Sequence, residues 1–359
     1  MKKLFFLLLV SSPLLLFSQQ PGAASAEFSS SKGVDTNYIK NYKDKLILAL
    51  WQSERRFDIS MAQTINADSG LSKINYVANS NQVTGVSLDF DIIGFAIGFR
   101  SVPNRDKRTG NTDYLDLGLN FTTKGIRFEN SFKRYTGFYD ANTKNYTIPF
   151  NDTTPYFQNP SMNIRVVKSK VIYSINKNKF ALGAAYANTK RQIKGAGSWL
   201  VVGNFYGLSM NADSSLIPNP VQPYYGIVWD GFNKMNIYAY SFGAGGTRTF
   251  VFWKNFYFNV LASIGLEKQF RHFYTYPEDV HFSYWKTWFA ADWRVALGYN
   301  NKNFFMRLTS ISDINRYDAK DMQLGLTFVG GSFDIGYRFG IKPPKVYKKF
   351  QETKLYGYF

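Results

Sequence analysis

The chain has 359 residues, a formal net charge of +18 and no cysteine. Without cysteine it cannot carry a disulfide, a thiolate metal site, a cysteine nucleophile or the acylated cysteine of a lipoprotein. Its aromatic content of 18% exceeds what a soluble domain needs and is typical of a transmembrane β-barrel, in which Tyr and Trp line both membrane interfaces.

The first residues have the order of a secretory signal peptide. Lys2 and Lys3 precede an apolar stretch over residues 4–17. This stretch is shorter than the roughly 20 apolar residues that span a bilayer as a helix. We expect cleavage after Ser18, with residue 26 as an alternative end. The sequence therefore predicts a signal peptide over residues 1–18 and a periplasmic segment over residues 19–43.

Residues 44–340 predict an all-β fold, a transmembrane antiparallel β-barrel of about 12 to 14 strands. Apolar and polar residues alternate, so each strand has one face for lipid and one for the lumen. The candidate strands cover residues 45–61, 83–90, 95–100, 115–121, 126–129, 162–175, 180–186, 236–250, 256–268, 285–299, 304–309, 322–328 and 333–339. We expect Phe258, Val260, Ile264, Phe289, Val295 and Leu297 to face lipid, and Asn259, Glu267, Asp292 and Arg294 to face the lumen.

Connections alternate in length, as short periplasmic turns and long extracellular loops do in outer-membrane barrels. Short turns are expected near residues 91, 122–124, 176–178, 254 and 300–302, and at Gly330–Gly331, a glycine pair suited to a two-residue hairpin. Long loops are expected over residues 102–112, 137–161, 190–235, 271–283 and 312–321. Residues 341–359, with five lysines, form a basic C-terminal tail in which a last strand is left open.

Charges of both signs fall on the expected lumen faces. A wide pore selective for anions would be lined mainly by Lys and Arg. The mixture instead predicts a lumen partly filled by paired side chains. The residues concerned are Asp89, Arg100, Asp116, Arg127, Glu129, Lys133, Glu267, Asp292, Arg294, Arg307, Asp334 and Arg338.

The segment over residues 190–235 is the candidate site. It is far longer than a connection needs and too apolar to stay solvated. We expect it to fold over or into the outer end of the barrel as a plug or a partner surface. The candidate contacts for an anionic group or a partner are Arg191, Lys194, Trp199 and Tyr206.

Both histidines of the chain, His272 and His281, lie near Glu278 and Asp279. They suit a metal site or an acid–base pair, but proximity in a loop is equally typical of ordinary polar residues. No phosphate-binding glycine loop, zinc motif or nucleophile elbow is present. We therefore expect no cofactor, no metal and no catalytic residue.

The positive charge indicates anionic partners. Nucleic acid does not fit an exported barrel, so we expect outer-membrane lipids, including lipopolysaccharide, and other outer-membrane proteins. Solvated loop charge without a specific ligand explains the same residues equally well.

Short motifs across the mature chain resemble a known family. They include Tyr76-Val77-Ala78-Asn79, Arg134 to Tyr139, Asp213 to Pro218, Gly336-Tyr337-Arg338-Phe339 and Pro343-Pro344. In these the chain is similar to the Bacteroidota outer-membrane barrel family known as domain of unknown function 4421. The resemblance implies a barrel in the outer membrane and supplies no activity or catalytic residue.

Three functions remain open at this point. The first is a non-enzymatic accessory or structural subunit of an outer-membrane assembly. The second is a channel or transporter for a small solute or lipid. The third is an outer-surface hydrolase, for which His272 and His281 are the candidates.

Overall fold

The computed structural model describes residues 34–42, 45–64, 71, 73–80, 82–101, 106–275, 281–318, 321–353 and 356, without the side chains of 55, 281, 282 and 313–315. The expected signal peptide and its cleavage site lie outside the described residues. Within the described part of the chain, no helix is both long enough and apolar enough to cross a membrane.

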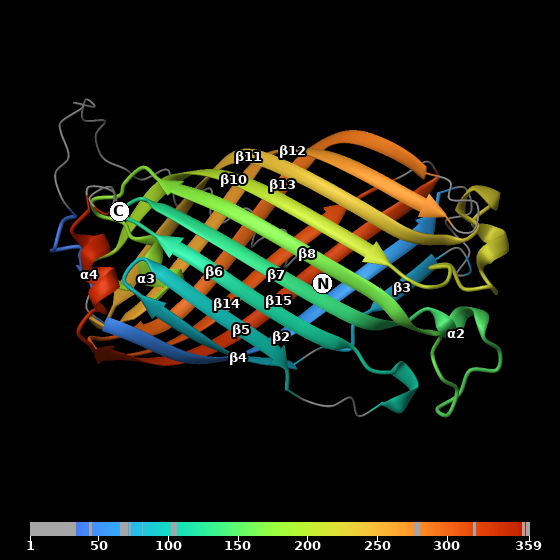
Figure 1. Ribbon diagram of the computed structural model, residues 1–359, viewed down its shortest axis with the longest axis horizontal. Helices are drawn as coiled ribbons and strands as arrows, with labels where there is room; N and C mark the ends of the chain where they lie inside the picture. The colour runs from blue at the N-terminus through green and yellow to red at the C-terminus, as the bar shows by residue number, and fades with distance from the viewer. Residues whose placement is uncertain are drawn as a thin grey trace. The chain divides into compact units, whose positions relative to one another are not determined.

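A closed antiparallel barrel of 12 strands is the main body of the described chain (Figure 1). The order around the barrel follows the sequence, and β15 closes it by pairing with β2 from Met322↔Gln63 to Gly340↔Lys45. The strands are β2 (Lys45–Gln63), β4 (Gln82–Phe90), β5 (Ile93–Arg100), β6 (Asp113–Thr122), β7 (Ile126–Asp140), β8 (Gln158–Ser174), β10 (Ala196–Asn211), β11 (Phe232–Phe252), β12 (Phe256–Thr275), β13 (His281–Asn300), β14 (Phe304–Arg316) and β15 (Met322–Gly340). The predicted fold class is confirmed, and the strand number lies within the predicted range.

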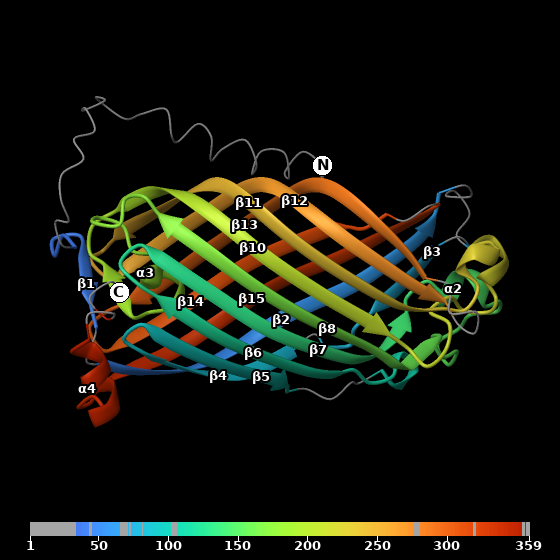
Figure 2. The same cartoon turned by 45° about the horizontal axis from the view of Figure 1, so that its top comes forward.

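The two ends of the barrel differ (Figures 1 and 2). At what we call the turn end, short turns join β4 to β5, β6 to β7, β11 to β12 and β13 to β14. This end also carries α3 (Leu182–Tyr186), α4 (Lys345–Gln351) and a small sheet of β1 (Ile39–Asn41) with β9 (Lys190–Gln192). At the loop end, long connections carry η2 (Lys107–Thr109), α2 (Thr143–Tyr146), η3 (Gln222–Tyr224) and η4 (Ile227–Trp229).

A short extra strand completes the wall at the loop end. β3 (Lys73–Val77) pairs with β2 over Asp58–Ala62 and reaches β7 at Tyr139 and Asp140. β3 pairs with the part of β2 that lies toward the loop end, beyond the part that pairs with β4. The strands β4, β5 and β6 are among the shorter ones of the barrel.

The alternation of faces agrees with the sequence prediction. Outward residues are apolar and exposed, as at Ile264 (63%) and Phe289 (67%), whereas Asn259 (0%) and Asp292 (8%) are buried in the lumen. Such a belt of outward apolar side chains is the surface that a membrane barrel presents to lipid.

Several sequence predictions are wrong, and three of them concern whole elements and have a physical reason. The predicted strand over 180–186 is the helix α3, because its small Leu-Gly-Ala-Ala run fits inside the lumen and Ala and Leu favour helix. The predicted hairpin at Gly330–Gly331 is the middle of β15, since both glycines have partners in β14 and in β2.

The third error is the single loop over 190–235. Residues 196–211 of that segment form β10, so the loop is confined to 212–231. The strand was hidden by Gly203 and Gly207, which interrupt its apolar face. In the barrel these glycines lie opposite Phe242 and Tyr238 of β11.

The C-terminal tail forms α4 and no further strand among its described residues. Tyr347 Oη donates to Asp91 Oδ2 at 3.1 Å, and the Phe90 and Tyr347 rings meet edge to face at 5.0 Å. Gln351 and Tyr356 donate to the same carboxylate. The tail is therefore held against the turn between β4 and β5.

Candidate functional site

The lumen is filled at the turn end by the connection between β8 and β10. This turn-end plug, residues 175–195, enters the barrel and contains α3, with Phe180 and Ala185 fully buried. Its apolar side chains pack on inward residues of β8, β10 and β12, such as Ile172, Leu200 and Leu261. This connection is longer than a turn between two neighbouring strands requires, and its additional residues fill the lumen.

Polar side chains of the barrel wall fix this plug in place. Arg307 Nη1 donates to the Ala185 carbonyl at 3.1 Å, and Arg338 Nε donates to the Asn188 carbonyl at 2.9 Å. Tyr186 Oη donates to Asn259 Oδ1 at 2.5 Å. Because these bonds come from β12, β14 and β15, they hold α3 to several sides of the barrel.

The loop end is closed by an apolar core. Inward side chains of ten strands, β3 among them, form one buried cluster with loop 212–231, which we call the lid. Tyr225 and Trp229 of the lid are fully buried. Tyr225 Oη donates to the Met61 carbonyl at 2.9 Å, and Trp229 Nε1 donates to Asp321 Oδ1 at 2.8 Å. The lid is therefore a packed part of the fold.

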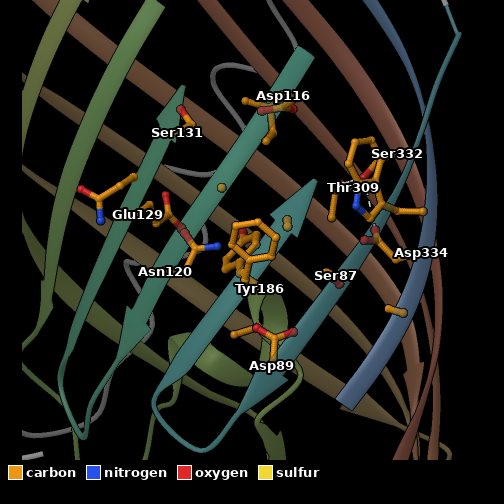
Figure 3. A pocket seen from close by; sticks show the side chains of 18 of the residues that line it. Ser87, Asp89, Asp116, Asn120, Glu129, Ser131, Tyr186, Thr309, Ser332 and Asp334 are labelled. Atoms are coloured by element: carbon orange, nitrogen blue, oxygen red, sulfur yellow. Dashed lines mark hydrogen bonds between the residues drawn. The ribbon is translucent and has the colours of Figure 1, made fainter. Parts of the chain in front are cut away.

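Between the two closures lies a polar chamber of about 310 Å³. Figure 3 shows Tyr186 of α3 at its centre, with Glu129 on one side and Asp334 on the other. Six basic and four acidic side chains line it: Arg127, Lys133, Lys168, Lys170, Arg294 and Arg307, with Asp89, Asp116, Glu129 and Asp334.

Ion pairs across the chamber join distant strands. Glu129 on β7 lies 2.6 Å from Arg127 Nε and 2.7 Å from Arg294 Nη1 on β13. Asp292 pairs with Lys170 on β8 and lies 3.4 Å from Arg294 Nε. All these side chains are at most 17% exposed. The predicted lumen of paired charges is confirmed.

A further ion pair, between β14 and β15, involves an arginine that also binds the plug. Arg307 Nη2 lies 3.0 Å from Asp334 Oδ1 while its Nη1 binds α3. Arg127 Nη2 donates to the Tyr186 carbonyl at 3.4 Å, and the Arg294 guanidinium lies 5.8 Å from the Tyr186 ring centre. The same arginines therefore bind carboxylates of the wall and the backbone or ring of the plug.

Chemically, the side chains of the chamber can stabilise the barrel through their ion pairs, or the chamber can accommodate a small polar solute. Its excess of basic groups would favour an anion, but most of its charges already have partners. The described residues contain no group of three or more His, Cys, Asp or Glu side chains placed to hold a metal ion.

The structure does not bring the four sequence-predicted site residues together. Arg191 lies at the turn end, where its Nη2 donates to Asn255 Oδ1 at 2.7 Å, and Lys194 lies over the Tyr38 ring there. Trp199 is 62% exposed on the outer surface, and Tyr206 lines the lumen. The predicted outer loop is wrong for all four: Arg191 and Lys194 precede β10 and lie at the turn end, opposite the lid, and Trp199 and Tyr206 belong to β10 itself. Anion or partner contact by any one of them stays a prediction.

His272 does not face the lumen. His272 is at the outward face of β12, where its Nδ1 lies 2.9 Å from Ser283 Oγ on β13. The side chain of His281 and the residues Glu278 and Asp279 lie outside the described part of the structure.

Sequence reasoning missed the residues that hold the plug. Tyr186 lay in a segment predicted to be a strand, and Lys170 lay in a predicted strand without being assigned to the lumen. For Lys170 a signal existed, because it falls on the same alternate positions as Met162 and Ile164, which are inward. For Tyr186 the sequence offers no period that separates a lumen helix from a strand.

The comparisons with known proteins give one family and several similar folds. The family model described as Domain of unknown function (DUF4421) matches residues 33–339. No curated protein sequence matches the chain.

Among solved structures, the outer membrane protease OmpT from Escherichia coli is 8% identical, with 84% of this chain and 98% of that chain covered and a TM-score of 0.40. The transport unit of the autotransporter AIDA-I from Escherichia coli is 8% identical, with 87% and 94% covered and a TM-score of 0.33. The toluene transporter TodX from P. putida is 8% identical, with 83% and 91% covered and a TM-score of 0.27. At these scores none of the likenesses bears on activity.

Proposed function

Because the chain belongs to the Domain of unknown function (DUF4421) family, whose description names no activity, we propose a function from the closed lumen itself. The protein is a non-conducting barrel that serves as an accessory or structural subunit of an outer-membrane assembly. The observation that carries this proposal is that packed side chains fill the lumen at both ends, with charges between them already paired.

The barrel is placed in a bacterial outer membrane with the turn end toward the periplasm. Its outward apolar belt and its contrast of short turns and long loops support this orientation. The chain has no cysteine, so single cysteines can report it. A membrane-impermeant maleimide should label an Ile227→Cys variant on intact cells. It should label a Trp253→Cys variant, at the opposite end, only after the outer membrane is permeabilised.

A test of the subunit role measures the ion conductance of the purified chain and the protein composition of its native complex. The purified chain in a planar bilayer should give no steady ion conductance, because neither end is open. Extraction from native membranes in mild detergent should give a complex with a partner at fixed stoichiometry. A purified monomer that conducts ions, or a native protein that elutes alone, would contradict the proposal.

The second candidate is a gated transporter, favoured by the chamber of about 310 Å³. Transport would require the turn-end plug to leave the lumen. A short chemical crosslinker between cysteines at Ala185 on α3 and Tyr257 on β12, which face each other in the structure, would prevent this movement. The subunit proposal expects the crosslinked protein to keep its cellular role, and the transport alternative expects that role to be lost.

The proposal assigns no catalytic role to the chain. His272, the one histidine whose side chain is described, faces outward, and no metal-binding group is found among the described residues. The outward position of His272 keeps it out of the chamber on which the proposal rests.

A further inference from the structure

The outward face of β7 and β8 changes from apolar to basic between two successive outward residue pairs. Phe132 and Val167 lie opposite each other in the apolar belt, and Val167 is 45% exposed. The next outward pair toward the loop end is Arg134 and Arg165, which are both exposed. Two basic residues therefore stand side by side where the apolar belt ends.

This arrangement is unfavourable without a counter-charge. Directly opposed residues of an antiparallel pair have Cβ atoms about 4.5 to 5.5 Å apart, and like charges there repel. Arg165 Nε donates to Asn163 Oδ1 at 3.2 Å, which is a neutral partner. Within the described chain, no carboxylate oxygen lies within 4.0 Å of either guanidinium group. The acidic residue nearest in the ladder, Asp113, is one step further away, opposite Thr136.

Several other outward basic residues lie against a carboxylate or an aromatic ring. Arg56 lies 2.5 Å from Asp58, and Lys234 and Lys268 lie over the rings of Tyr274 and Trp285. Arg248, near the turn end, lies over Phe250. Arg134 and Arg165 differ from these residues because they stand directly opposite each other in the ladder.

The position and chemistry of the pair indicate its ligand. Guanidinium groups bind phosphate oxygens through paired, charge-assisted hydrogen bonds. Basic side chains at the edge of the apolar belt reach the depth of lipid headgroups. Ser209 on β10 lies opposite Arg165 and extends the polar row.

We propose that Arg134 and Arg165 together bind the phosphate group of an outer-leaflet lipid. This inference uses the orientation proposed above, with the loop end outward, but not the partner role. The lipid lies against the wall formed by β7, β8 and β10, and its phosphate supplies the negative charge that the two arginines lack.

The test uses the full mature chain in phosphatidylcholine nanodiscs doped with bisphosphorylated lipid A, with retained lipid counted by native mass spectrometry. Wild type should retain lipid A, and an R134Q/R165Q variant should bind it at least roughly tenfold more weakly, since losing about 1.4 kcal/mol is tenfold. Arg248→Gln is the matched control and should bind like wild type.

Further arms separate the sources of phosphate. Dephosphorylated lipid A should be retained no better than phosphatidylcholine, and inorganic phosphate should not displace lipid A. Equal binding by R134Q/R165Q, retention of the dephosphorylated lipid, or displacement by inorganic phosphate would each overturn the lipid-phosphate site. If the double variant fails to insert, Arg165→Lys, which keeps the charge and loses the planar pairing, should still weaken retention, and unchanged retention would overturn the proposal. Because no partner protein is present, this result is independent of the subunit role, and cysteine labelling at Ile227 tests the leaflet separately.

Discussion

Arg294 and Glu129 are 165 residues apart in the sequence and 2.7 Å apart across the lumen. Their contact joins β13 to β7 through the interior of the barrel, in addition to the ladders that join neighbouring strands around the wall. With Arg127, it also brings Tyr186 of the plug into the same network.

Removing one charge from this network should be costly. Glu129→Gln leaves the guanidinium groups of Arg127 and Arg294 buried without their shared carboxylate, and breaking a buried pair in this way costs about 3 to 5 kcal/mol. Glu54→Gln, at an exposed outward position on β2, should change the unfolding free energy by less than about 0.5 kcal/mol. Urea unfolding in lipid vesicles measures both, and equal costs would show that the network does not stabilise the barrel.

The two faces of the barrel wall should respond differently to a new charge. Ile264→Lys places an ammonium group in the lipid belt and should cost about 2 to 4 kcal/mol near the midplane. Ser87→Lys places the same group in the chamber near Asp89 and should cost less than about 1 kcal/mol. If the two variants lose the same unfolding free energy, the assignment of faces is incorrect.

The lid should behave as core. Trp229 is fully buried and donates a hydrogen bond to Asp321, so Trp229→Ala should cost about 3 to 5 kcal/mol. Trp253→Ala, at a turn residue that is 81% exposed, should cost less than about 1 kcal/mol. The unfolding free energy of each variant, from chemical denaturation in detergent, measures the difference. A Trp229→Ala protein as stable as wild type would mean that the lid is not packed into the lumen.

The attachment of the C-terminal tail should depend on pH in one direction. Burial, followed by the neighbouring Asp91 carboxylate, raises the pKa of Tyr347 above its usual 10.0. The protonated hydroxyl is the donor, so the contact is fully present below pH 10 and is lost only as pH rises through the raised pKa. Hydrogen exchange of α4 should therefore be slow and constant from pH 5 to about 9, after correction for the intrinsic rate. Tyr347→Phe should exchange faster across that whole range, and an unchanged rate would exclude the bond to Asp91 as the attachment.

The histidines should be dispensable. His272 faces outward, and an H272A/H281A variant removes every imidazole of the chain. Complementation of a deletion strain should be normal with this variant. Loss of complementation together with normal membrane insertion would restore the enzyme hypothesis, because no other imidazole or thiol could replace them.

Alternation of residues predicted the wall of the barrel well and its interior poorly. In β12 and β13 the period of two is uninterrupted, so Ile264 and Asp292 were assigned to the correct faces. In β10 the glycines at 203 and 207 break that period, and the large side chains at these points, Phe242 and Tyr238, belong to the neighbouring strand β11. Local pattern cannot show a contribution from another strand.

The sequence predicted that charges of both signs would pair in the lumen, but not which residues form each pair. The mixture of inward charges indicated salt bridges. Which residues pair is set by the register of strands far apart in the chain, as for Lys170 and Asp292, which are 122 residues apart. The plug was not predictable, since its short alanine-rich run reads equally well as a strand.

The pairing of β2 with β15 has a consequence for how the protein is made. The first and last strands of the barrel are each other's neighbours along their full 19 residues. A chain that stops before residue 322 therefore has two open sheet edges, and in a bilayer no water is available to satisfy their backbone groups. We therefore expect the barrel to insert only when the chain is complete through β15. A prematurely terminated product would stay outside the bilayer, as a substrate for chaperones and proteases.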